Sequence, residues 1–116
     1  MGRAAAIAGV ALLLLTFPGA ARAACPLSGT QNYARKADLP AAAVAALGFP
    51  MAERGAPFQI TDVILPGRRL PSARFIAARR TACTIALRYE LGGIARRFET
   101  AILERRGNNW VRVRER

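Results

Sequence analysis

The 116-residue sequence has no histidine and only seven acidic residues. Histidine is the commonest general base at neutral pH and the commonest metal ligand, so its absence removes many hydrolytic and metal-dependent mechanisms. Serine occurs only at Ser28 and Ser72, neither of which has a neighbouring base pattern, and this argues against a serine nucleophile. Two cysteines without histidine do not make a zinc site. The sequence therefore predicts neither an enzyme nor a bound metal or cofactor.

The few carboxylates have structural roles open to them. Asp38 suits a helix N-cap, and Glu90 and Glu99 suit partners for arginines across a pair of strands. An acid pair formed by Asp62 and Glu104 is conceivable, but nothing in the sequence brings these two residues together. We therefore expect no catalytic residues.

Residues 1–23 have the composition of a secretory signal peptide. Arg3 is followed by an apolar run over 4–17, then by Pro18-Gly19 and a small-x-small cleavage site at Ala21 to Ala23. This run is shorter than the about 20 residues that a membrane-spanning helix needs. We expect cleavage after Ala23, export to the periplasm or the medium, and no membrane span in the mature chain.

Two cysteines, Cys25 and Cys83, would remain after cleavage, and an oxidising compartment would join them in a disulfide. In the chain-entropy model, a disulfide that closes a loop of this length stabilises the fold by roughly 4 kcal/mol. A contribution of this size matters for a small domain. The alternative is a lipoprotein acylated on Cys25, but Arg22 stands where such signals usually carry Leu, Val or Ile. A redox-active role is disfavoured because the sequence has no Cys-x-x-Cys motif.

One helix is predicted, over residues 38–48, after an irregular lead-in over 24–37. Asp38 suits its N-cap, Pro40 its first turn and Gly48 its end. Its narrow apolar stripe consists of Leu39, Ala43, Val44 and Leu47. A short helix of this kind is not stable alone, so we expect it to pack on the apolar side of a sheet.

Alternating apolar and polar side chains over 74–114 predict an antiparallel meander. Further strands are predicted over 58–65, with a bulge near Asp62, and over 73–78. Gly92-Gly93 is interpreted as a two-residue hairpin loop, and Gly107-Asn108 or Asn108-Asn109 as the next one.

The loop at Gly92-Gly93 sets the expected register of the central hairpin. Leu87 would face Phe98, and Cys83 would face Ile102, so these apolar side chains are assigned to the buried face. On the last strand, Val111 and Val113 would share the face of Ile102. The opposite, outer face would carry Leu103 together with Trp110, Arg112 and Arg114.

These elements predict a single small α+β domain over residues 38–116, with one N-terminal helix packed on a four- to five-stranded antiparallel meander. An antiparallel sheet curled around one helix resembles, in outline, the small cystatin-like and NTF2-like α+β proteins. The stretches Leu39 to Gly48 and Ala56 to Val63 also resemble the openings of uncharacterised exported proteobacterial proteins. The resemblance covers about half of the mature chain and implies no activity and no catalytic residue.

The chain is strongly basic, with 18 basic residues that are all arginine except Lys36. Loss of Arg3 and Arg22 with the leader would lower the net charge from +11 to +9, and such a surface attracts anions. Paired arginines should meet at two turns on the same end of the sheet, where they could bind phosphate or carboxylate groups. The candidate anion-binding residues are Arg79, Arg80, Arg105, Arg106, Arg112 and Arg114.

The arginines could serve only to keep a small domain soluble. Beside that interpretation, two binding roles stay open for this basic chain. The first is a disulfide-stapled, non-catalytic binding module of the cell envelope, whose partner is another envelope protein and whose sheet leaves an apolar patch uncovered. The alternative is a protein that binds an anionic polymer such as lipopolysaccharide or peptidoglycan. Nucleic acid is not expected as a partner of an exported chain, and the sequence does not set the oligomeric state.

Overall fold

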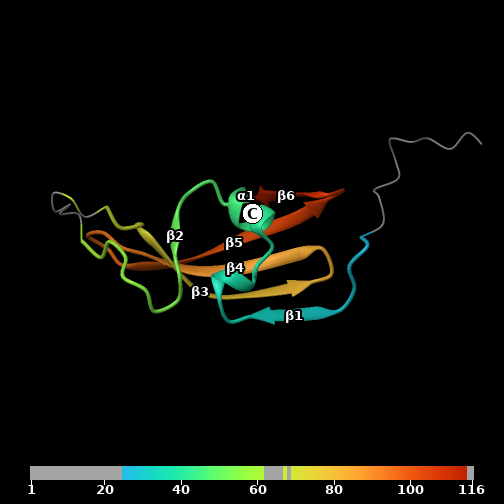
Figure 1. Cartoon of the computed structure of the whole chain (residues 1–116), viewed down its shortest axis with the longest axis horizontal. Coiled ribbons are helices and arrows are strands. Elements are labelled where there is room, and N and C mark those ends of the chain that lie inside the picture. Colours follow the sequence, from blue (N-terminus) through green and yellow to red (C-terminus); the bar gives the residue numbers. More distant parts are fainter. Residues whose placement is uncertain (1–24, 62–66, 68, 115–116) are drawn as a thin grey trace, which may run out of the picture.

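Figure 1 shows a computed structural model of the chain, which describes residues 25–61, 67 and 69–114. The described chain is mostly sheet and has little helix. The β3–β4 and β5–β6 turns lie at one end of the sheet, and the loop between β4 and β5 lies at the other. We call the first the disulfide end and the second the loop end.

Six strands form the sheet: β1 (Thr30–Tyr33), β2 (Met51–Ala52), β3 (Ala73–Thr81), β4 (Thr84–Leu91), β5 (Arg97–Arg106) and β6 (Asn109–Val113). The order is β1-β3-β4-β5-β6 with antiparallel neighbours throughout, while the short β2 pairs with β3 in parallel. The meander from β3 to β6 is therefore confirmed. The lead-in over 24–37 is not wholly irregular as expected, because β1 lies within it and pairs with β3.

The helix is much shorter than predicted. A 3-10 helix at Lys36–Asp38 is followed by α1 at Ala41–Ala46, whose N-cap is Pro40. The expectation that Asp38 caps this helix is wrong, because Leu39 lies between them in an extended conformation with ψ 150°. A residue that precedes proline is driven out of the helical region, so Pro40 separates Asp38 from α1. The predicted α+β class is thus correct only in part.

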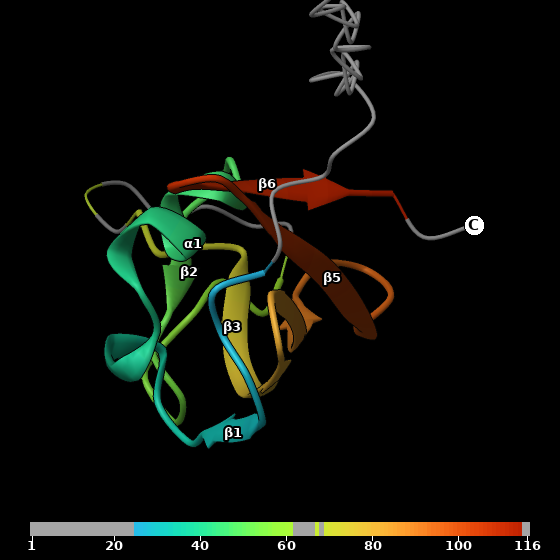
Figure 2. The same cartoon turned by 90° about the vertical axis from the view of Figure 1, so that its right-hand side faces the viewer.

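The core lies on one face of the sheet. In Figure 2 the strands form an arc from β1 through β3, β4 and β5 to β6, with α1 and β2 inside the arc. The largest fully buried side chains come from three neighbouring strands and are Phe75, Ile85, Leu87 and Leu103. Leu39, Ala43 and Leu47, from the residues in and around α1, are buried in the same cluster. The apolar stripe predicted for the helix therefore includes core residues, although the helix itself is only six residues long.

The register of β4 and β5 is shifted by three residues from the predicted one. Leu87 faces Ala101 instead of Phe98, and Ile85 faces Leu103. Because side chains alternate with a period of two, an odd shift exchanges the two faces of β5. Ala101 and Leu103 are buried, while Phe98 is 55% exposed and Ile102 is half-buried. The expected pairing of Cys83 with Ile102 is also wrong, since Cys83 lies in the turn between β3 and β4.

A close approach of two backbones explains the shift. The N–H of Gly92 donates to the carbonyl of Ser72, and the N–H of Gly93 donates to that of Ile60, each at 2.9 Å. A Cβ atom at Gly92 would overlap the carbonyl oxygen of Gln59. Because the two glycines have no side chains, the segment around residue 60 can lie directly against their backbone. The loop then extends over 92–96 instead of two residues. The other predicted loop, Gly107-Asn108, is confirmed, because Arg106 faces Asn109.

Replacing Gly92 by alanine should lower the free energy of unfolding by about 2 kcal/mol, because the added methyl group meets backbone that must move. Urea denaturation of the purified protein measures this loss. Ser72→Ala is the matched control, since it removes an exposed hydroxyl but leaves the carbonyl that binds Gly92, and we expect a change of less than about 0.5 kcal/mol. Equal effects of the two substitutions would contradict the proposed close approach.

Two sequence predictions lie wholly or partly outside the described residues. The leader over 1–23 is one of them, and the other is the second half of the strand expected over 58–65, with its bulge near Asp62. In the described half, residues 58–61 do not form a strand, although the N–H of Gln59 donates to the carbonyl of Pro71 at 2.7 Å. Among the described residues, no helix has the length and apolar character needed to cross a membrane.

Candidate functional site

The large hydrophobic side chains that the described chain exposes lie at the loop end. These side chains, here called the apolar tip, are Ile60, Leu70, Ile94 and Phe98. Ile94, in the loop between β4 and β5, is 95% exposed, and Phe98 follows as the second residue of β5. Figure 1 shows this loop beside the segment that leads into β3, far from the β3–β4 turn. The fold therefore gathers apolar side chains at one end instead of scattering them.

Backbone hydrogen bonds hold the parts of the apolar tip together. Ile60 accepts from the N–H of Gly93, directly before Ile94. Gln59 donates to Pro71, directly after Leu70. Residues far apart in the sequence are thus fixed side by side, and the tip has a defined geometry in the described residues.

Arginines lie next to the apolar tip in the sequence and in space. Arg69 precedes Leu70, and Arg97 precedes Phe98. The side chain of Arg97 is 64% exposed and lies 3.7 Å from Glu99. The guanidinium carbon of Arg88 lies 5.5 Å from the centre of the Phe98 ring. The tip is therefore both apolar and cationic.

A buried carboxylate at the loop end anchors two more arginines. Glu90 is only 4% exposed, and its two oxygens accept from Arg74 at 2.5 Å and from Arg96 at 2.6 Å. Arg74 also donates to the carbonyl of Ala56 at 3.3 Å, and its guanidinium carbon lies 4.2 Å from the centre of the Phe58 ring. This ion cluster joins β3, β4, the loop after β4 and the segment before residue 60, so it fixes the base of the apolar tip.

The environment of Glu90 keeps it ionised. Burial alone would raise the pKa of this carboxyl group, but hydrogen bonds from Arg96 and Arg74 and the charges of both guanidinium groups outweigh burial. The pKa of Glu90 is therefore below its ordinary value. A general acid needs a raised pKa instead, so Glu90 is suited to a structural role.

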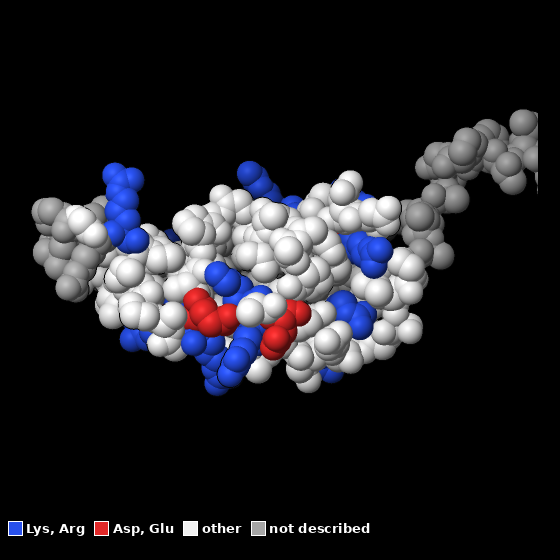
Figure 3. All heavy atoms as spheres, in the orientation of Figure 1, with Lys and Arg blue, Asp and Glu red and all other residues white. Residues whose placement is uncertain are grey.

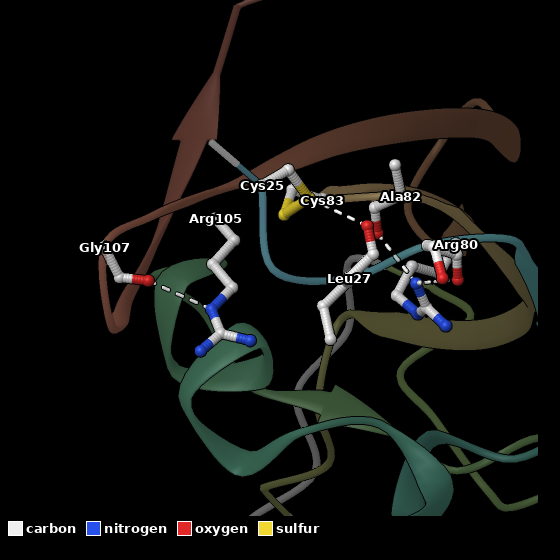
Figure 4. The surroundings of a disulfide bond; sticks show 8 residues. Cys25, Leu27, Arg80, Ala82, Cys83, Arg105 and Gly107 are labelled. Carbon is white, nitrogen blue, oxygen red and sulfur yellow. Dashed lines mark hydrogen bonds between the residues drawn. A yellow bond between two sulfur atoms is a disulfide. The ribbon is translucent and has the colours of Figure 1, made fainter. Parts of the chain in front are cut away.

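The opposite end carries the predicted disulfide, which the structure confirms. Cys25 and Cys83 are joined with their Cα atoms 5.8 Å apart. Arg80 and Arg105 lie on either side of the disulfide in Figure 4. Arg80 donates to the carbonyl of Ala82 at 2.8 Å, and Arg105 donates to that of Gly107 at 3.0 Å. Both guanidinium groups therefore hold the turns at this end of the sheet.

The turns that carry the paired arginines do lie at the same end, since the N–H of Arg105 donates to the carbonyl of Cys83 at 2.8 Å. However, alternation along a strand sends neighbouring side chains to opposite faces. Arg79 and Arg106 share the outer face, where Arg106 lies 3.7 Å from Glu104. Arg80 lies on the face of Ile85, the core face. The four guanidinium groups divide between two faces, and their role in anion binding stays a prediction.

Arg112 and its neighbours on β6 also differ from expectation. Arg112 does face Leu103, as predicted, but that face is the core face. Its guanidinium donates to the Leu47 carbonyl and the Tyr89 hydroxyl at 3.4 Å each, and its carbon lies 5.3 Å from the centre of the Phe49 ring. Arg112 thus joins β6 to the end of α1. On the same face, Trp110 packs partly buried against the core, and Arg114 is exposed.

Acidic side chains on the face drawn in Figure 3 gather near the middle, and basic side chains lie beside them. One open hollow of about 490 Å³ is lined by Ala34, Arg35, Ala37, Glu53, Arg54 and Gly55. Burial raises the pKa of Glu53, but backbone N–H groups of Arg54, Lys36 and Ala37 outweigh it and lower the pKa. These same hydrogen bonds, at 2.7 to 3.0 Å, occupy the carboxylate, so it serves to fold the segment around the 3-10 helix.

Sequence reasoning missed the apolar tip because it placed Phe98 in the core. Ile94 had a local signal, since it follows Gly92-Gly93 and lies two residues before Arg96-Arg97. Within the described ranges, no three His, Cys, Asp or Glu residues are grouped so that they could hold a metal ion. No protein-family model, curated protein or solved structure matches the chain. Functional inference therefore depends on the geometry of the two ends.

Proposed function

We propose that the protein is an exported, non-catalytic binding module of the cell envelope and that the apolar tip is its contact surface. One observation carries this proposal: Ile60, Leu70, Ile94 and Phe98 are exposed, next to arginines, at one end of the sheet. Exposed apolar surface costs free energy in water, so a gathered patch usually marks an interaction site. The partner thus covers side chains that the fold leaves uncovered.

Other features support export and a rigid module. A disulfide between Cys25 and Cys83 is typical of an oxidising compartment, and the predicted leader over 1–23 provides a route there. In this proposal α1 and its flanking residues cover the core face, which is the α+β arrangement expected from the sequence. The outer face and both ends then stay available for contacts.

Binding to an anionic polymer through the disulfide end is the second candidate. It is favoured by Arg79, Arg80, Arg105 and Arg106, whose turns meet at that end. Its affinity would fall steeply with added salt, because guanidinium–anion attraction is screened. These four arginines are divided between the two faces of the sheet and do not form one cluster, so this candidate is the weaker of the two.

Co-sedimentation with a cell-envelope fraction distinguishes the candidates. We expect the purified protein to sediment with the envelope, and the double variant Ile94→Ser, Phe98→Ser to bind about tenfold or more weakly, because two exposed apolar anchors are lost. The matched comparison is Arg79→Ser, Arg80→Ser, Arg105→Ser, Arg106→Ser at the other end. Loss of binding in this quadruple variant, with full binding by the apolar-tip variant, would reject our proposal in favour of the polymer-binding candidate.

A further inference from the structure

We infer that the partner of the apolar tip is the surface of a phospholipid bilayer that contains anionic headgroups. This inference rests on the proposed function, since it identifies what covers the tip. Ile94, Ile60 and Leu70 would enter the boundary between headgroups and acyl chains, and the neighbouring arginines would contact phosphate groups. No residue of the disulfide end takes part.

The first argument is the position of the apolar side chains at the end of the sheet. Ile94 is 95% exposed in a loop, and Ile60 and Leu70 flank it on the adjoining segment. A projecting end of a protein can contact a planar bilayer, whereas a small ligand is usually enclosed in a pocket. In the described chain, the hollow lined by Arg35 and Glu53 lies in a different segment from the tip. The tip therefore suits insertion better than enclosure.

The second argument is the alternation of apolar and cationic residues. Arg69 is adjacent to Leu70, and Ile94 and Ala95 are followed by Arg96, Arg97 and Phe98. Surfaces that bind anionic membranes combine these two kinds of group, because the apolar side chains enter the boundary while the charges stay with the headgroups. The side chains of Arg96 and Arg97 are 55% and 64% exposed, so phosphate can reach them.

The third argument concerns the local charge. Within the described residues, Arg96 and Arg97 pair with the carboxylates Glu90 and Glu99, and Arg69 and Arg88 add two further positive charges. Glu90 is buried and shared between Arg74 and Arg96, so it holds Arg96 in place without presenting a negative surface. The surface of the tip that these described residues form is therefore positive. Such a surface is attracted to the negative headgroup of phosphatidylglycerol, whereas a neutral bilayer offers no such attraction. The headgroup charge is therefore the variable to test.

Vesicle binding with a site-specific probe tests this inference. Trp110, the one tryptophan, lies near the disulfide end and should report no insertion. In a Trp110→Phe background, Ile94→Trp places the only indole on the tip. With vesicles of phosphatidylcholine and phosphatidylglycerol, we expect a blue shift and quenching by brominated acyl chains for this variant. The parent protein, with Trp110 alone, should show neither change.

Affinity measurements supply the matched variants. Ile94→Ser should weaken binding to anionic vesicles about tenfold, whereas Ile94→Leu should retain it, because apolar volume at the tip is what matters. Arg69→Ser with Arg97→Ser should weaken binding and reduce its salt dependence, whereas Arg79→Ser with Arg106→Ser, at the far end, should have little effect. All these side chains are exposed, so circular dichroism should show unchanged folds.

Three results would overturn the inference. The first is equal binding to vesicles with and without phosphatidylglycerol, and the second is quenching of Trp110 instead of the indole at position 94. The third is tip-dependent binding to the envelope fraction without any binding to vesicles, which would mean that the partner is a protein. That last result would leave the proposed function standing, whereas loss of tip dependence in the envelope assay would remove both.

Discussion

Reduction of the Cys25–Cys83 disulfide should lower the free energy of unfolding by about 4 kcal/mol, the largest single effect that we expect. The cross-link spans 58 residues, so its removal returns much conformational freedom to the unfolded chain. Cys25 lies five residues before the start of β1, and Cys83 lies two residues after the end of β3, with which β1 pairs. Urea denaturation with and without reductant measures the loss.

The control is the double variant Cys25→Ala, Cys83→Ala, whose stability should match that of the reduced protein and should not respond to reductant. Intact mass with and without reductant establishes beforehand that the bond is formed. A loss of less than about 1 kcal/mol would show that the pairing of β1 with β3 does not depend on the disulfide. Three of the four residues of β1 are exposed, so we expect the opposite.

Glu90→Ala should lower the free energy of unfolding by about 3 kcal/mol, because it leaves the partly buried Arg74 without its ionic partner. Arg96 would also lose its anchor, so the loop between β4 and β5 should become more mobile. Urea denaturation gives the stability, and hydrogen exchange of the loop amides gives the local effect. Glu99→Ala is the matched control, since this half-exposed carboxylate lies 3.7 Å from Arg97 and should contribute less than about 1 kcal/mol.

The lowered pKa of Glu90 also predicts a dependence of stability on pH. A carboxyl group whose pKa is lower in the folded than in the unfolded state stabilises the fold at pH values above its unfolded pKa of about 4.3. This contribution is lost as the pH falls through the lower, folded pKa. Glu90→Gln should therefore remove part of the acid sensitivity while leaving a hydrogen-bonding side chain. An unchanged acid dependence would show that other carboxylates cause it.

Features with local or chemical signals were predictable from the sequence. Alternation over 74–114 gave the meander, and Gly107-Asn108 gave its last hairpin, because a two-residue loop with glycine is encoded within the turn itself. The disulfide followed from the inference of an oxidising compartment that left two cysteines, Cys25 and Cys83. Each of these inferences used residues adjacent in the sequence or a small set of possible partners.

The register of β5 was not predictable in the same way. Residues of both parities on β5 include apolar side chains, Phe98 and Ile102 on one face and Ala101 and Leu103 on the other. The choice depends on Gly92, which admits the backbone of Gln59, 33 positions earlier in the sequence. A contact of this kind leaves no local pattern. The exposure of Phe98 at the apolar tip was hidden for the same reason, because it depends on the observed register.

Two other errors could have been avoided with local rules. Pro40 disfavours a helical conformation at Leu39, so Asp38 was a poor choice of cap. The period of two along a strand also separates Arg79 from Arg80, which argues against a single cluster of four guanidinium groups. Both corrections concern neighbouring residues and need no knowledge of the fold.

The position of the cross-link has a consequence for the biogenesis of the chain. Synthesis runs from the N-terminus, so the thiol of Cys25 exists before its partner 58 residues later has been made. During that interval β1 also lacks β3, the strand with which it pairs. An early thiol without its partner can attack the disulfide of a small molecule, which leaves a mixed disulfide on Cys25 and releases the other sulfur as a thiol. Oxidative maturation must therefore wait for translation of Cys83, and an oxidant that acts earlier would produce mixed disulfides.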